Sequence, residues 1–108
     1  MKTSELTEYV LDRAVMRCEG LSKWLHGRIK YSSDWSEAGP IIEREEISIS
    51  REFHSGSVEW AAWTPAPIRD DAEAFGYGPT PLIAAMRCYV ASKLGDEIDV
   101  PVEWAEDK

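Results

Sequence analysis

The fold is decided by GPTPLIAAMRCYVASKLG, residues 78–95 of the chain. Thr80 predicts the start of a helix, because its hydroxyl can accept a hydrogen bond from a free N–H of the first turn. Pro81 suits the first helical position, and Gly95 suits a left-handed C-cap. Apolar or small side chains occupy almost the whole circumference between these caps, which indicates a helix buried on most sides. We therefore expect the other elements to pack around this helix.

Length and composition indicate one small acidic domain over residues 1–108. A chain of 108 residues, 44% of them hydrophobic, can form one modest core. The sequence has no run of about 18 apolar residues, so no membrane span is expected. The N-terminus, MKTSELTEY, lacks a signal-peptide core, which predicts the cytoplasm. We expect the ends, about residues 1–6 and 103–108, to fray.

A second helix is expected from Thr7 or Glu8 to about Cys18, since apolar residues recur there at helical spacing. Leu6 and Leu11 can form a hydrophobic staple at its start. Residues 21–31 can form two short strands around Gly27. These features place a helix near the N-terminus of the domain.

The middle of the chain predicts a short helix and a hairpin. A helix is expected to start at Ser33 or Asp34, to break, and to restart at Pro40. Residues 47–53 and 58–63 alternate with period two around a turn, which predicts two antiparallel strands. We expect residues 64–78 to be a loop and residues 96–102 to add another strand or an extended edge. The predicted class is α+β, with a small antiparallel sheet packed against an N-terminal helix and a long buried C-terminal helix.

The formal charge of −8 argues against direct nucleic-acid binding, which needs Lys and Arg to replace phosphate counterions. It permits a basic protein partner, or a surface that imitates the charge of DNA; solubility alone is the simpler alternative. The acidic residues considered for such a surface are Asp70, Asp71, Glu73, Asp96, Glu97 and Asp99.

Motifs for chemistry are lacking in the sequence. The two histidines and two cysteines are scattered, so we expect no metal site, and Cys18 and Cys88 are interpreted as core thiols. There is no nucleophile motif and no phosphate-binding loop. We therefore predict no catalytic residue and no cofactor.

Five tryptophans are too many for a core of this size, so some are expected at a contact surface. Trp63 and Trp104 are the predicted exposed contacts. Asp34, Trp35 and Arg44 form a second candidate site.

Arg87 on the C-terminal helix is a further candidate for partner binding. A plainer role for it is an ion pair with Asp34 or Glu43.

Three blocks resemble the NinX family of phage and prophage proteins: MKTSELTEYVLDRAVMRCEG (1–20), YSSDWSEAGPIIERE (31–45) and YGPTPLIAAMRCYVASKLGDEIDVP (77–101). The resemblance implies a small accessory protein of a tailed phage, made in the cytoplasm of the bacterial host. The last block is also similar to phage sandwich domains of α/β/α type. The family has no activity that can be carried over to particular residues.

Two functions follow as hypotheses. The first is a non-enzymatic protein that binds a host or phage protein and modulates its activity, in a sharper version as a DNA mimic acting on a defence or recombination protein. The alternative is a small ligand-binding protein or enzyme with a pocket near Asp34, Trp35 and Arg44. Homodimer formation is also open, since small domains with spare aromatic side chains often associate.

Overall fold

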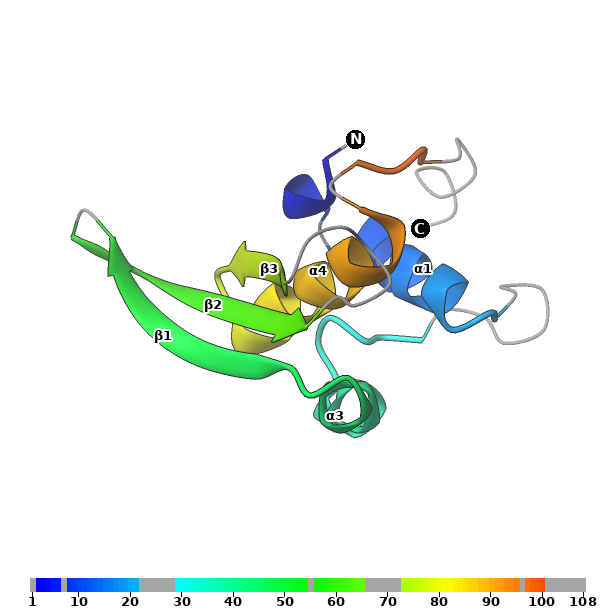
Figure 1. The fold of residues 1–108 in the computed structure, drawn as a ribbon, viewed down its shortest axis with the longest axis horizontal. Helices are drawn as coiled ribbons and strands as arrows, with labels where there is room; N and C mark the ends of the chain where they lie inside the picture. The colour runs from blue at the N-terminus through cyan, green and yellow to red at the C-terminus, as the bar shows by residue number, and fades with distance from the viewer. Residues whose placement is uncertain are drawn as a thin grey trace.

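The computed structural model describes residues 2–6, 8–21, 29–54, 56–65, 73–95 and 97–100. Helices of the described chain lie on one face of a three-stranded antiparallel sheet (Figure 1). The elements, in chain order, are η1 (Thr3–Glu5), α1 (Glu8–Cys18), α3 (Trp35–Arg44), β1 (Ser48–His54), β2 (Ser57–Pro65), β3 (Glu73–Gly78) and α4 (Pro81–Leu94). This arrangement confirms the predicted α+β class.

Helix α4 is the centre of the core, as the sequence predicts. The Thr80 hydroxyl accepts a hydrogen bond from the Ile83 N–H at 3.1 Å. Gly95 ends the helix with a φ of 92°, and its N–H donates to the Ala91 carbonyl. Nine of the fourteen residues of α4 are buried. The helix packs against β3 and β2 on one side and α1 on another, so its apolar circumference is covered from several directions.

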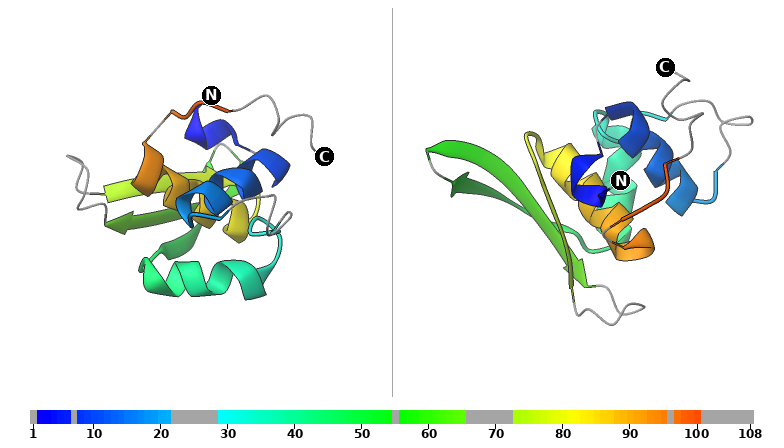
Figure 2. Two further views of the ribbon diagram at one scale, coloured as in Figure 1. Left: turned by 90° about the vertical axis from the view of Figure 1, so that its right-hand side faces the viewer. Right: turned by 90° about the horizontal axis from the view of Figure 1, so that it is seen from above.

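The sheet has the order β1-β2-β3, and α4 packs against one face of it (Figure 2). In the register, Ala62 of β2 pairs with Ile49 of β1 and with Gly76 of β3. These three positions share the face that meets α4. The hairpin of β1 and β2 extends beyond the end of α4, which leaves Phe53 near the hairpin tip 75% exposed.

Strand β3 approaches α4 so closely that only glycine fits at its centre. A Cβ added to Gly76 would lie 2.3 Å from the Ala84 carbonyl oxygen and 2.4 Å from the Cys88 backbone nitrogen. One added to Gly78 would lie 2.7 Å from a methyl carbon of Ile83. Glycine allows this contact because it has no side chain between the two backbones.

The prediction that residues 64–78 form one loop is therefore wrong. Residues 73–78 are the third strand, with alternating exposed and buried positions. Its glycines, which indicated turns in the sequence, allow the strand to pack closely against α4. Residues 97–100, expected to belong to a further strand, contribute a single bridge between Lys2 and Glu97.

Helix α3 also differs from the prediction, because it runs without a break through Gly39 and Pro40. Proline there removes one backbone hydrogen bond, but the carbonyl it would have used belongs to exposed Ser36, which water can reach. Burial of Ala38 and Ile41 against the core keeps the helix continuous.

One smaller expectation in the first third of the chain is corrected as well. Residues 29–31 are not a strand, and the rest of that predicted pair lies outside the described residues. Within residues 2–6, Thr3 donates to the Gly95 carbonyl at 2.7 Å, and Leu6 is fully buried with Leu11. Fraying of the two ends stays a prediction. Residues 101–108 lie outside the described residues.

Candidate functional site

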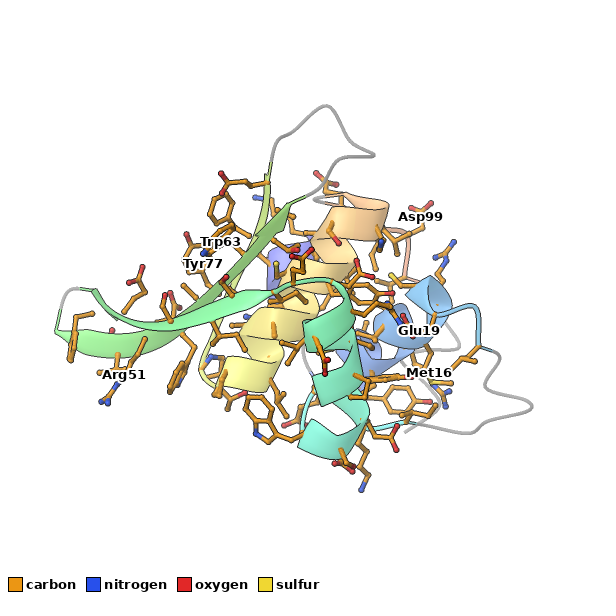
Figure 3. All side chains as sticks on the ribbon, turned by 60° about the horizontal axis from the view of Figure 1, so that its bottom comes forward. Met16, Glu19, Arg51, Trp63, Tyr77 and Asp99 are labelled. Carbon is orange, nitrogen blue, oxygen red and sulfur yellow. The ribbon has the colours of Figure 1, made fainter. Side chains whose placement is uncertain are left out.

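One face of the sheet is left without a covering helix in the described part of the chain (Figure 2). Large aromatic side chains project from it: Trp63 is 43% exposed, Phe75 53% and Tyr77 42%. Trp63 and Tyr77 lie on the side of the sheet away from α4 (Figure 3). We call this surface the open face and define it by the outward positions within residues 48–52, 59–63 and 73–77 of the three strands. They are Ser48, Ser50, Glu52, Glu59, Ala61, Trp63, Glu73, Phe75 and Tyr77.

The strand register brings the aromatic residues together. Trp63 pairs directly with Phe75, and Ala61 pairs with Tyr77. Directly opposed side chains on one face of an antiparallel pair are close enough to pack on each other. The exposed aromatic residues thus form one contiguous patch along β2 and β3.

A shallow hollow of about 500 Å³ adjoins the open face beside Trp63. It lies where the end of α3 meets the start of β1. Its lining residues are Ile42, Glu43, Glu46, Ile47, Ser48 and Trp63. Among the described residues, the lining combines apolar side chains, an indole ring and two carboxylates, and none of these residues is basic.

The same C-terminal end of α3 also carries a polar cluster that we call the clamp, made of Glu19, Arg44, Glu45, Tyr89 and Lys93. Arg44 donates two hydrogen bonds to the Glu19 carboxylate, at 3.2 and 2.7 Å, and a third to Glu45 at 2.9 Å. The Tyr89 hydroxyl donates to Glu19, and Lys93 pairs with Glu45 at 3.0 Å. The clamp therefore ties the end of α1 to α3 and α4.

The surroundings of Glu19 and Glu45 in the clamp favour the charged, deprotonated form of both carboxylates. Burial alone raises the pKa of Glu19, but hydrogen bonds from Arg44 and Tyr89 outweigh it, so the pKa lies below the ordinary 4.5. The pKa of Glu45 is likewise lowered, with Arg44 and Lys93 outweighing desolvation. Desolvation and the bond to Glu19 raise the pKa of Tyr89, which keeps its hydroxyl protonated.

We expect the clamp to make folding sensitive to acid. Carboxylates with a lowered pKa in the folded state add stability above their unfolded pKa of about 4.5, and that stability is lost as the pH falls through the folded pKa. Arg44→Met should cost about 1 kcal/mol near neutral pH, because half of the Arg44 side chain is exposed to solvent, and clearly less at about pH 3. Urea unfolding at both pH values measures this. An equal loss at both values would contradict the role of these carboxylates.

Asp34, Trp35 and Arg44 do not form one site. Asp34 caps α3, where it accepts hydrogen bonds from the Ser36 N–H at 2.9 Å and from the Ser36 hydroxyl. These bonds lower the pKa of Asp34. Arg44 lies at the opposite end of the helix, in the clamp. The alternative function that needs these three residues in one pocket is not supported by their arrangement.

A separate cavity of about 500 Å³ lies beside Trp35. Neither Asp34 nor Arg44 lines it. It is bounded by Glu8, Lys30, Ser32, Ser33, Trp35, Thr80, Pro81, Leu82 and Ile83. Trp35 is itself exposed, but it belongs to this cavity and not to the open face.

Comparison with known families decides the relationship that the sequence blocks indicate. A model of the bacteriophage P22 NinX family matches residues 2–93. The chain belongs to the NinX family. A comparison with curated proteins finds no match. Membership gives this NinX-family protein no biochemical activity, so its function has to be argued from its own surfaces.

Arg87 has a structural role in the NinX-family chain that differs from the predicted ion pair. Its guanidinium donates to the carbonyls of Leu6 at 2.8 Å and Tyr77 at 2.7 Å. Desolvation lowers its pKa, and Glu59 opposes that shift. Arg87 thus joins β3 and the N-terminal segment to α4. Within the described residues, it has no ion pair with Asp34 or Glu43.

The two cysteines of the NinX-family protein are free thiols in protected settings. Burial raises the pKa of each to about 12, with Glu19 adding to the effect at Cys18. A thiol is a nucleophile only when deprotonated, so these two side chains are inert near neutral pH.

The described residues contain no group of three or more His, Cys, Asp or Glu placed to hold a metal ion. Among the described helices, none has the length and apolar character of a membrane span. Trp104, Asp70, Asp71 and Asp96 lie outside the described residues.

Sequence reasoning found Trp63 but missed Phe75 and Tyr77, because it placed them in a loop. The missed signal is the alternation of small and aromatic residues in Ala74-Phe75-Gly76-Tyr77-Gly78, which has the period of a strand.

Proposed function

We propose that this NinX-family protein is a non-enzymatic accessory protein that binds a host or phage protein through the open face and modulates its activity. The observation that carries this proposal is the contiguous patch of Trp63, Phe75 and Tyr77 on a sheet face that no described helix covers. Single exposed apolar residues are normal on protein surfaces, whereas a contiguous aromatic patch typically marks an interaction site.

The chemistry of the patch supports a protein partner. Tryptophan and tyrosine are the residue types that most often dominate binding energy at protein interfaces. Each presents a large rigid area with few rotatable bonds, so little conformational entropy is lost on binding. The net charge of −8 also favours encounter with a basic partner over nucleic acid.

The experiment is quantitative capture of partners on the immobilised full chain, from lysates of infected and uninfected host cells. The double variant Phe75→Ser, Tyr77→Ser should lower the recovery of a specific partner about 10-fold or more, because it removes two anchor side chains. Trp35→Ser is the matched control: it removes an exposed aromatic residue that lies outside the open face.

Two outcomes would count against the proposal. One is a partner that survives the open-face variant but is lost with Trp35→Ser. The other is light scattering in which the wild-type chain is a dimer and the open-face variant a monomer, since a second copy would then occupy the face.

The sharper version, a DNA mimic, needs carboxylates spaced like phosphates over one surface. Of the six acidic residues considered for it, only Glu73, Glu97 and Asp99 are within the described residues, and all three are exposed. This version stays a prediction.

A further inference from the structure

We infer that the partner presents an arginine side chain to the hollow beside Trp63. This inference rests on the proposed function and deepens it, because it names the chemistry by which the partner is recognised. It follows from three observations: the composition of the hollow, the charge of the surface around it, and the way this same chain holds an arginine of its own.

The hollow offers separate surfaces for the two parts of an arginine side chain. Ile42, Ile47 and the Trp63 ring can pack against its aliphatic stem and the flat face of the guanidinium. Glu43 and Glu46 supply the carboxylates that a guanidinium binds through paired N–H groups.

The described residues of the open face and the hollow carry negative charge, which favours a cationic partner. In the part of the chain that the structure describes, no lysine or arginine is among the residues that define the open face or line the hollow. Within the described chain, the carboxylates of Glu43 and Glu46 take part in no ion pair. Glu52 and Glu59 face each other directly across β1 and β2, an arrangement of like charges that destabilises a sheet. This pair lies four register positions from Ser48 and Trp63, so it adds to the negative charge of the open face but does not line the hollow.

The clamp shows the same set of groups with the arginine in place. Arg44 binds the carboxylates of Glu19 and Glu45, and its guanidinium carbon lies 5.8 Å from the centre of the Tyr89 ring. The hollow repeats this chemistry, with two glutamates and an aromatic ring, but no arginine is among its described lining residues.

Arginine fits this site better than lysine. A guanidinium is planar, so it can stack on an indole ring and bind a carboxylate through two hydrogen bonds at once. A lysine ammonium is a compact and strongly hydrated charge that can do only one of these well.

The experiment measures binding of labelled peptides to the full chain by fluorescence anisotropy at physiological salt. The probe is a short Gly-Ser peptide with three arginines, and the matched peptides carry lysine or neutral citrulline at the same places. We expect the arginine peptide to bind saturably, the lysine peptide about 5-fold more weakly, and the citrulline peptide without saturation.

Variants then locate the site. Trp63→Ala and the double variant Glu43→Gln, Glu46→Gln should each weaken binding of the arginine peptide about 10-fold. The double variant Glu5→Gln, Glu97→Gln is the matched control: it changes the net charge by the same amount at exposed residues away from the hollow. It should alter the affinity less than about 2-fold at this salt concentration. Circular dichroism and urea unfolding establish that every variant is folded.

Equal weakening by the two double variants would overturn the inference, because binding would then depend only on net charge. So would an arginine peptide that does not bind, or one whose affinity is unchanged in Trp63→Ala. The capture assay separates the two proposals. Loss of a partner in Phe75→Ser, Tyr77→Ser combined with no response to arginine peptides would leave the protein-binding function standing and remove the arginine site.

Discussion

Gly76→Val is expected to unfold most of the protein at physiological temperature. A side chain at this position would need the space of the Ala84 carbonyl oxygen and the Cys88 backbone nitrogen, 2.3 and 2.4 Å from the new Cβ. These are backbone atoms of a buried helix, so they cannot rotate away as a flexible side chain could. The sheet and α4 would have to separate, at a cost of roughly 4 kcal/mol or more, a large part of the stability of a domain this size.

Gly39→Ala is the matched control for that substitution. Gly39 lies inside α3, and a Cβ there would meet no atom within 4 Å. Because alanine favours a helix interior over glycine, this variant should be more stable by up to about 1 kcal/mol. Urea unfolding of both variants gives the comparison, and a Gly76→Val protein as stable as the wild type would show that β3 and α4 are not packed as described.

Tyr89→Ala should have the second largest effect, a loss of about 3–5 kcal/mol in the free energy of unfolding. The ring of Tyr89 is 1% exposed and belongs to the central core. Its removal leaves a cavity beside α4 and deprives Glu19 of a hydrogen-bond donor. Both effects act in the same direction.

Tyr77→Ala provides the comparison for Tyr89, since the same residue type there lies on the open face. Its loss should cost no more than about 1 kcal/mol, the range of strand preferences on a solvated face. Tyr89→Phe keeps the ring and removes only the hydroxyl, so it separates the core contribution from that of the clamp. Thermal unfolding of the three variants measures the order, and equal losses for Tyr77→Ala and Tyr89→Ala would contradict the assignment of inner and outer faces.

The elements that could be predicted from the sequence are those set by local chemistry. The capping residues Thr80 and Gly95 mark the ends of α4 by themselves, and the alternation of residues 47–53 is visible without any tertiary information. These predictions are confirmed, as is the first helix, α1, at Glu8–Cys18.

The features that escaped prediction depend on neighbours distant in sequence. In the sequence, Gly76 indicates a turn. In the structure it is required for packing, because the backbone of α4 leaves no room for a side chain at this position. Pro40 indicates a break in α3, but tertiary burial of Ile41 keeps the helix continuous.

Part of the candidate site could be predicted from the sequence and part could not. Trp63 was predicted to be an exposed contact, and it is 43% exposed, whereas its role as a contact stays a prediction. The hollow requires Glu43 and Glu46 of one segment to meet Trp63 of another, which no local pattern indicates. The role of Arg87 was missed because its partners are the backbone carbonyls of Leu6 and Tyr77, and every residue has such a carbonyl, so no residue type indicates the contact.

The α/β/α layering implied by the resemblance to phage sandwich domains is not found in the described residues, where the helices lie on one side of the sheet. The described chain therefore has two layers.

Strand β3 assigns its two sets of alternate residues to separate tasks. Ala74, Gly76 and Gly78 are buried on the side of α4, whereas Phe75 and Tyr77 are exposed to solvent. Substitutions at the outward positions can therefore change recognition while the domain stays folded. An insertion of one residue has no such freedom: it would turn the aromatic rings toward the helix and the glycines outward, so stability and recognition would fail together.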